Sequence, residues 1–257
     1  WSLPSMAPLA HTLALLAMAV ATTAIKVVSL DMAQNSFDDQ YQGCGPAMTA
    51  ALPALMRSEF QQNPLFARVW KEAAAEWHER GSRVSPLASP EQAIAIMAYT
   101  MNDLYREFNA AVRSAGRSRQ EYRDNFHFKT LHFLLSQALV TLRKAQGSQC
   151  RNVFRGVCST QFTAQRGDTV RFGQFASTSD REEVCEAFGK DTAFQVLTCH
   201  GVNIQDFSYF PHEEEVLILP FETFNVTAVT HKGDRAQIQL RSTGTFSNYN
   251  CEWLRGD

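Results

Sequence analysis

The chain has 257 residues, and 24 Lys and Arg against 26 Asp and Glu give it a formal net charge of −2. This balance excludes a strongly basic nucleic-acid binder and a polyacidic protein. Hydrophobic residues make up 45% of the chain and include 18 Phe and 4 Trp. That composition excludes a disordered chain and suffices for the core of one large domain or two small ones.

The N-terminal segment, residues 1–24, is dominated by a short apolar run over residues 9–21. The run is too short to span a bilayer as a helix, which takes about 20 residues, but it is typical of a secretory signal peptide. We therefore expect residues 1–24 to be a signal peptide, with extra residues ahead of a start at Met6. The alternative is a buried N-terminal helix, because no Lys or Arg precedes the run. Three small residues are candidates for the cleavage site: Ala19, Ala21 and Ala24.

Residues 45–146 have helical periodicity, and three helices are predicted there. The first begins at the cap Asn63-Pro64 and ends at Gly81. The second follows a capping box that starts at Ser89 and is predicted to run unbroken to Gly116. The apolar stripes of the three helices cover residues 65–77, 94–112 and 131–142.

A basic linker is predicted between the second and third helices. We interpret it as a solvated loop, with a phosphate contact as the less favoured alternative. Its four arginines are Arg113, Arg117, Arg119 and Arg123.

Residues 150–254 are mostly β in pattern, with short runs rich in Val, Phe, Thr and Ile that are broken by Gly, Asp, Asn and Pro. One short helix is expected at residues 182–188. Helices followed by strands indicate an α+β domain, and we expect residues 25–257 to form one such domain. No GxGxxG or GxxxxGK[ST] motif is present, so neither common nucleotide-binding loop is indicated. The predicted strands cover residues 152–157, 169–177, 193–198, 215–221, 224–231, 236–241 and 249–254.

The first of three polar insertions in these strands is Arg155. Side chains alternate along a strand, so Arg155 shares a face with the apolar Val153 and Val157. A guanidinium on such a face needs an anion or several acceptors, and Gly156 allows close approach to the backbone. The pattern leaves two alternatives, an internal ion pair and an anionic ligand.

The second insertion is Ser177-Thr178-Ser179-Asp180 at the end of a strand. Ser177 and Ser179 lie on one face of that strand. A cap for the helix predicted at residues 182–188 would also explain these residues, so this insertion alone does not indicate a site.

The third insertion is Glu213-Glu214-Glu215, which runs directly into a core strand. With strand alternation, Glu213 and Glu215 point the same way with Cα atoms about 7 Å apart. Like charges at that distance need a cation nearby, or one of the two must hold a proton. The alternative is an acidic loop before a strand. His212 does not complete an HExxH motif, and no metal-ligand spacing is found.

Six cysteines without a CxxC pair indicate disulfides in an oxidising compartment and argue against a zinc ribbon, but six allow about 15 pairings. Asn225 begins the N-glycosylation sequon. The chain ends in NCEWLRGD, without the apolar tail of a lipid-anchor signal. We therefore expect a free secreted protein with no membrane span, and a monomer, since no feature indicates an oligomer.

Together and in this order, the FRG strand, the Ser-Thr-Ser strand and the Glu-x-Glu segment form an R-S-E arrangement. They resemble the arginine-specific mono-ADP-ribosyltransferases of vertebrates, ecto-enzymes related to certain bacterial toxins. The resemblance covers residues 37–254, and the missing apolar tail is similar to the soluble, secreted avian type. Each short piece is a weak signal, whereas the ordered set is specific. Further stretches agree: NVFRGV, FGQFASTS, CHGVNIQDFSYFPHEEEVLILPFE and NYNCEWL.

This resemblance implies a helical N-terminal part packed on two antiparallel β-sheets, with NAD in the cleft between them. NAD would be a co-substrate, and no prosthetic group or metal is expected. The resemblance also implies the disulfides Cys44–Cys251 and Cys150–Cys199, which leaves Cys158–Cys185 as the third pair.

Site roles follow from the same resemblance. Arg155 would hold the phosphate and ribose region of NAD, and Gly156 would offer its backbone to the nicotinamide amide. Ser177 would fix the catalytic Glu215 and the ribose, and Glu213 would engage the acceptor arginine. A loop over residues 205–212 would shape acceptor recognition. Less specific matches give three further NAD-proximal residues, Tyr122, Gln174 and Ser208, and two aromatic residues for the acceptor, Tyr209 and Phe207.

The implied function is transfer of ADP-ribose from NAD to the guanidinium of arginine in a protein or a small acceptor, with release of nicotinamide. Cleavage of the nicotinamide–ribose bond leaves positive charge on the sugar, and a fixed carboxylate stabilises such a charge. One alternative is a secreted NAD glycohydrolase, which has less need of Glu213. Another is an inactive disulfide-stabilised binding protein, in which degenerate R-S-E positions would be expected.

Overall fold

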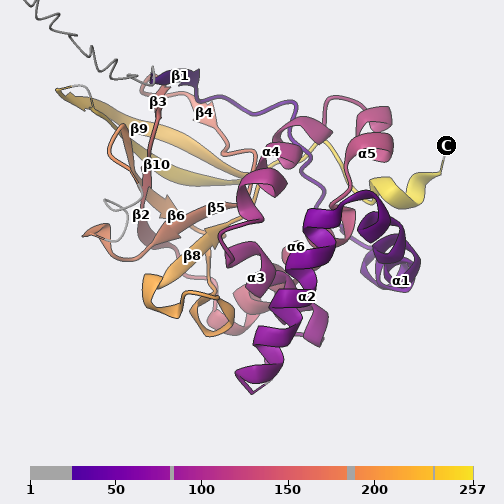
Figure 1. Cartoon of the computed structure of the whole chain (residues 1–257). Helices are drawn as coiled ribbons and strands as arrows, with labels where there is room; N and C mark the ends of the chain where they lie inside the picture. Colours follow the sequence, from indigo (N-terminus) through magenta and orange to yellow (C-terminus); the bar gives the residue numbers. More distant parts are fainter. Residues whose placement is uncertain (1–24, 82–83, 184–188, 234, 257) are drawn as a thin grey trace, which may run out of the picture.

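The structure, a computed structural model, describes residues 25–81, 84–183, 189–233 and 235–256. The expected signal peptide at 1–24 lies outside the described residues, as does most of the helix expected at 182–188. Helices gather on one side of the molecule and strands on the other (Figure 1). No helix within the described ranges is long and apolar enough to cross a membrane.

The α+β class is confirmed: within the described residues, six helices come before most of the strands in the chain. Asn63 caps the second helix, because its side chain accepts a hydrogen bond from the Phe66 N–H at 3.0 Å. The capping box expected at Ser89 does not form, because the Ser89 side chain makes no cap bond and Gln92 Oε1 accepts from the N–H of Ala88, one residue before the cap, at 3.0 Å. The described residues form six α-helices: α1 (Gly45–Gln62), α2 (Pro64–Glu79), α3 (Pro90–Thr100), α4 (Tyr105–Ala115), α5 (Arg119–Asn125) and α6 (Lys129–Gln146).

The second predicted helix is two helices in the structure. The chain turns extended at Met101, with φ −71° and ψ 144°, and α4 begins at Tyr105. Helix α3 is buried on all sides from Gln92 onward, whereas α4 has one buried face and one exposed face. One apolar stripe therefore concealed two helices in different environments. Helices α1 and α5 were not predicted, and α5 occupies part of the expected basic linker.

The strands differ from the expected pair of antiparallel sheets. One eight-stranded sheet has the order β4-β9-β10-β6-β2-β5-β8-β7, and only its β10–β6 pair is parallel. Strands β1 (Lys26–Ser29) and β3 (Thr160–Thr163) form a separate parallel pair within the described residues. The strand expected at 249–254 is instead a turn followed by the 3-10 helix η3 (Glu252–Arg255). The strands of the large sheet are β2 (Arg151–Val157), β4 (Thr169–Val170), β5 (Ala176–Ser179), β6 (Thr192–Thr198), β7 (Val202–Asn203), β8 (Glu215–Ile218), β9 (Glu222–Lys232) and β10 (Arg235–Thr245).

A buried ion pair joins the segment before α1 to the sheet and to the C-terminal segment. Asp38 and Arg171 have fully buried side chains, and Asp38 Oδ2 lies 2.5 Å from Arg171 Nη1. The same carboxylate accepts the backbone N–H of Asn248 at 2.9 Å. The disulfide Cys44–Cys251 ties the two segments a second time and confirms the first expected pairing.

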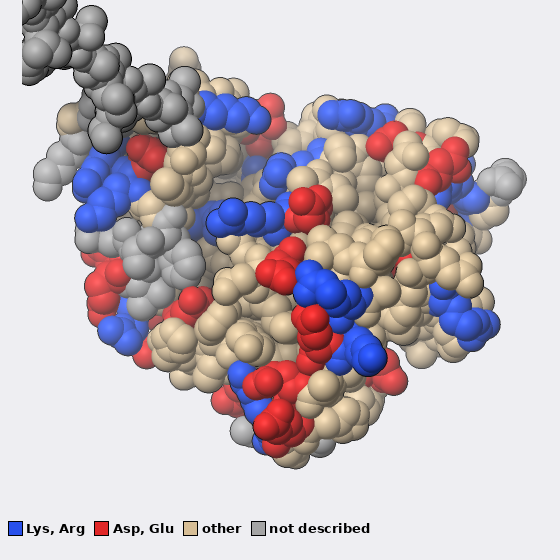
Figure 2. All heavy atoms as spheres, in the orientation of Figure 1, with Lys and Arg blue, Asp and Glu red and all other residues tan. Residues whose placement is uncertain are grey.

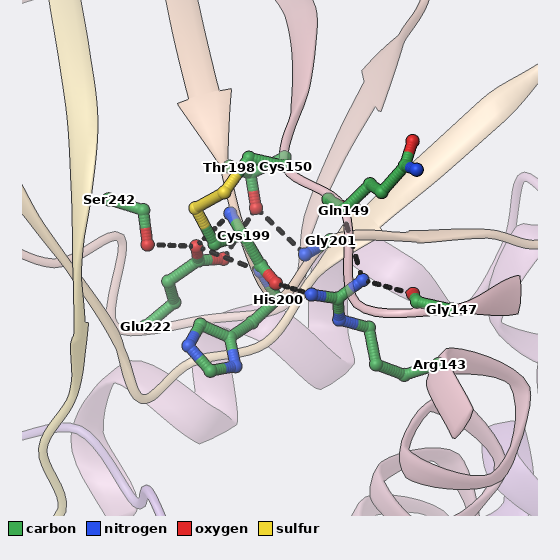
Figure 3. The surroundings of a disulfide bond; sticks show 10 residues. All are labelled: Arg143, Gly147, Gln149, Cys150, Thr198, Cys199, His200, Gly201, Glu222 and Ser242. Atoms are coloured by element: carbon green, nitrogen blue, oxygen red, sulfur yellow. Dashed lines mark hydrogen bonds between the residues drawn. A yellow bond between two sulfur atoms is a disulfide. The ribbon is translucent and has the colours of Figure 1, made fainter.

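A second disulfide, Cys150–Cys199, confirms another expected pairing and joins the start of β2 to the end of β6 (Figure 3). Glu222 is fully buried beside it and accepts the N–H of Cys199 at 2.9 Å. Arg143 of α6 donates to the carbonyl oxygens of Gly147 and Cys199, so the helical layer holds the same corner. The strand that carries Arg155 is thereby fixed at its start.

The third expected pairing, Cys158–Cys185, stays a prediction. Among the described residues Cys158 is exposed and has no disulfide partner. Cys185 lies outside the described residues.

Replacing Asp38 by Asn would leave the Arg171 guanidinium buried without its counter-ion. We expect the free energy of unfolding to fall by about 3–5 kcal/mol, the usual loss when one partner of a buried ion pair is removed. Urea denaturation measures it. The control is Arg68→Gln, which removes exposed pairs with Glu72 and Asp103 and should cost far less. Equal losses in the two variants would contradict the conclusion that the buried pair holds these segments together.

Candidate active site

A cleft of about 540 Å³ lies between the helical part and the sheet. The surface is hollowed between these parts, with basic side chains beside the hollow (Figure 2). Its walls come from the α3–α4 region, from strands β2, β5 and β8, and from the chain just before β5 and β8. The residues that line it include Tyr99, Asn109, Arg113, Arg155, Gly156, Gln174, Ser177, Phe210, Glu213 and Glu215.

Strand pairing brings the three R-S-E residues together. Strand β5 lies between β2 and β8, and its Ser179 pairs with Phe154 of β2 and with Glu215 of β8. Arg155 Nη1 donates to the Ser177 carbonyl oxygen at 2.6 Å. The Ser177 side chain hydrogen bonds to the Glu215 carboxylate. The residues expected at one site thus meet, although they lie far apart in the sequence.

Burial sets the protonation behaviour of Glu215. Its side chain is at the floor of the cleft and the residue is 5% exposed. Burial, with a smaller contribution from the charge of Glu213, raises the pKa of Glu215 to about 7. The hydrogen bond from Ser177 and the charge of Arg155 act in the opposite direction. Glu215 therefore changes charge near neutral pH, which is typical of a functional carboxyl group.

Glu213 lines the same cleft, but it is not part of the strand that carries Glu215. It ends the 3-10 helix η2 (Pro211–Glu213), and Glu214 has left-handed geometry with φ 49° and ψ 47°. The expectation that Glu213 and Glu215 alternate along one strand was therefore wrong, because the strand begins only at Glu215. Ser179 Oγ donates to the Glu213 carbonyl oxygen at 2.9 Å and fixes the turn. Partial burial raises the pKa of Glu213.

Two polar residues of the helical part support Ser177, and the sequence reasoning missed both. Tyr99 Oη lies 3.3 Å from Ser177 Oγ and donates to the Phe175 carbonyl oxygen at 3.0 Å. Asn109 Nδ2 donates to Tyr99 Oη at 3.2 Å. Burial, followed by the charge of Glu215, raises the pKa of Tyr99 to about 12, so the hydroxyl keeps its proton. Both residues lie within residues 94–112, where the sequence indicated only an apolar stripe.

Arg113 was also misassigned, because the basic segment was expected to be a solvated loop. It lies on α4 and lines the cleft, where its guanidinium donates to Gln174 Oε1. Burial and the nearby charge of Arg155 lower the pKa of Arg113. Two guanidinium groups at one cleft favour an anion with more than one charge. Gly156 and Gln174 line the cleft as expected.

Tyr122 and Ser208 were expected near NAD, and the structure places neither among the residues that line the cleft. Tyr122 is fully buried in the helical core, where its ring stacks on Phe37 with 4.0 Å between centroids. Ser208 is buried, and its Oγ accepts from the Phe210 N–H at 3.1 Å. Phe207 is likewise a core residue, which leaves Tyr209 of the two expected aromatic residues partly accessible.

Among the residues that the structure describes, no group of three His, Cys, Asp or Glu side chains is placed to bind a metal ion, at the cleft or elsewhere.

The fold and this cleft define a mono-ADP-ribosyltransferase. The chain is similar to the crystal structure of the eucaryotic mono-ADP-ribosyltransferase ART2.2, with a TM-score of 0.78 and 35% sequence identity over 89% of this chain and 100% of that one. Variants of ART2.2 have been crystallised with NAD and with NADH.

Residues 30–248 match the family model described as NAD:arginine ADP-ribosyltransferase, and the chain belongs to this family. It is 56% identical over 234 residues to an erythroblast NAD(P)(+)--arginine ADP-ribosyltransferase of Gallus gallus, covering 90% of this chain and 78% of the relative. It is 48% identical over 245 residues to a GPI-linked NAD(P)(+)--arginine ADP-ribosyltransferase 1 of Homo sapiens, covering 89% and 75%.

The raised pKa of Glu215 predicts a pH-dependent effect of Glu215→Gln on stability. The folded protein keeps the Glu215 proton up to about pH 7, whereas the unfolded chain loses it near its ordinary value of 4.5. In this window the unfolded state binds fewer protons, so the stability of the wild type falls as pH rises. We expect Glu215→Gln to gain stability relative to the wild type across the same window, as measured by urea denaturation. A difference that does not change with pH would contradict the burial of this carboxylate.

Proposed function

We propose that this protein transfers ADP-ribose from NAD to the guanidinium of arginine, in proteins or small acceptors, and releases nicotinamide. The observation that carries the proposal is the convergence of Arg155, Ser177 and Glu215 on one cleft. The family to which the chain belongs supports the substrate pair.

Arg155 and Arg113 would bind the diphosphate of NAD. A planar guanidinium donates two parallel hydrogen bonds to phosphate oxygens. The charge of Arg155 contributes to the lowered pKa of Arg113, and an anion bound by both would offset that repulsion. Gly156 lines the same wall and would offer its backbone to the nicotinamide amide.

Glu215 would stabilise the transition state for cleavage. The bond between nicotinamide nitrogen and ribose C1′ breaks, nicotinamide leaves with the bonding electron pair, and the sugar gains oxocarbenium character. A carboxylate held in place by Ser177 can stabilise that charge without reorganisation. Its buried position also makes the interaction strong, because little water screens it. The nicotinamide cation and the two arginines favour the ionised form of Glu215 when NAD is bound.

Glu213 would prepare the acceptor. A guanidinium with a pKa above about 12 is a poor nucleophile, so one of its nitrogens must lose a proton as its bond to C1′ forms. Glu213 lines the cleft beside Phe210, where it can orient the guanidinium and take that proton. Its raised pKa makes it a better base than an exposed carboxylate.

Incubation with labelled NAD, with and without agmatine, tests the proposed function. We expect label on agmatine from the wild type, and loss of both transfer and NAD cleavage in Glu215→Gln, by at least about 10²-fold if electrostatic stabilisation dominates. Circular dichroism would verify that the variant is folded. Wild-type-like turnover by Glu215→Gln would remove this residue from the mechanism.

Glu213→Gln separates the acceptor step from cleavage. We expect transfer to agmatine to fall by about 10²-fold, the scale of lost general-base catalysis, while NAD hydrolysis is retained in part. Chromatography of ADP-ribosylagmatine and free ADP-ribose measures both activities in one reaction. Equal losses of the two would argue against a role limited to the acceptor.

The same assay distinguishes the alternatives. Free ADP-ribose without labelled agmatine would indicate an NAD glycohydrolase, and no reaction would indicate an inactive binding protein. The two carboxylates and the arginine at the cleft favour the transferase over both.

We also propose that residues 1–24 are a signal peptide and that the mature protein is a secreted monomer. The two disulfides support an oxidising compartment. Expression in animal cells would show the location, since a secreted protein collects in the medium and gel filtration of that material gives its mass.

A further inference from the structure

The loop that carries Glu213 is attached to the end of α2. This β7–β8 loop (residues 204–214) lies between the two strands and includes the short helices η1 (Gln205–Phe207) and η2. Arg80, the residue that follows α2, donates from Nη1 to the Ser208 carbonyl oxygen and from Nη2 to the Tyr209 carbonyl oxygen, both at 3.0 Å. One guanidinium therefore holds two successive carbonyl groups of the loop.

Two further contacts orient this guanidinium. Arg80 Nε donates to Glu76 Oε1 at 2.5 Å, one helical turn earlier on α2. The centre of the guanidinium lies 5.1 Å from the centroid of the Tyr209 ring, within cation–π range. Every edge of the Arg80 fork thus has a partner, which a lysine could not reproduce.

The loop is held at its other end by the sheet. Ser179 of β5 donates to the Glu213 carbonyl oxygen at 2.9 Å. Beside the Arg80 contact, the Tyr209 N–H donates to Thr100 Oγ1 at 2.8 Å. The segment between these attachments contains Phe210 and ends at Glu213, both of which line the cleft.

We propose that Arg80 is a positioning residue for the acceptor step. It does not line the cleft and so does not touch the reacting atoms. It anchors the loop that presents Phe210 and Glu213, whereas the groups proposed to hold NAD lie on β2, β5, β8 and α4. Loss of Arg80 would displace the acceptor side and leave the NAD side in place. This inference rests on the proposed transferase function.

The experiment compares Arg80→Gln with the wild type in the labelled NAD and agmatine reaction. We expect the KM for agmatine to rise by about tenfold, since a displacement of 1 Å can cost up to about 10²-fold. The share of NAD converted to free ADP-ribose should rise with it. The KM for NAD should stay within about twofold, because the diphosphate contacts are not altered. This partition between two products would not change if Arg80 only stabilised the fold.

Two further variants complete the test. Lys71→Gln removes a positive charge from an exposed position on the same helix and should leave both KM values unchanged. Arg80→Lys keeps the charge beside Tyr209 but loses the fork, and should give an intermediate product ratio. Melting temperatures would confirm that all variants are folded at the assay temperature.

The outcomes separate this inference from the function on which it rests. If the wild type does not label agmatine, the transferase proposal fails and the role of Arg80 fails with it. If the wild type transfers and Arg80→Gln keeps the same product ratio, only the role of Arg80 is overturned. A parallel rise of the KM for NAD and agmatine would also overturn it, because the effect would then extend to the whole cleft.

Discussion

The site depends on a carboxyl group that the fold keeps out of water. Glu215 begins β8 at the floor of the cleft, and its burial places its pKa near 7. The neighbours that counteract this burial are Ser177 on the adjacent strand β5 and Arg155 on β2, the next strand of the sheet. A buried carboxylate is costly unless such donors compensate it. The alignment of β2, β5 and β8 therefore has two effects. It supplies the groups that stabilise the buried Glu215 carboxylate, and it places that carboxylate at the cleft.

The rest of the molecule keeps this alignment from shifting. The Cys150–Cys199 disulfide and the buried Glu222 fix the start of β2, and the Asp38–Arg171 pair fixes the segment before α1 against the sheet. Tyr99 brings the helical part to Ser177. Helices and sheet are thus connected by hydrogen bonds at the site itself, and these bonds hold the two walls of the cleft in fixed positions. Such preorganisation is what electrostatic catalysis requires.

Much of this could be predicted from the sequence, and the failures have physical reasons. Arg155, Ser177 and Glu215 were recognisable because polar side chains interrupt apolar strands in a known order. Tyr99 and Asn109 were hidden because helical periodicity reports which face is buried and not which buried groups are polar and paired. Arg113 was misassigned because the sequence does not distinguish an arginine near a helix end that lines a cleft from one that faces only solvent. Tyr122 was placed at the cleft by a less specific match to the family, yet its aromatic ring packs into the core.

The repulsion between Arg113 and Arg155 has a consequence for the free protein. Two cations face one cleft, and the charge of Arg155 disfavours the charged form of Arg113. A dinucleotide diphosphate seated there would relieve this unfavourable field as well as add its own contacts, so occupancy and global stability are linked. Added salt would screen the same repulsion in the empty protein. The thermal resistance of this protein should accordingly report the concentration of its substrate, and most sensitively in dilute buffer.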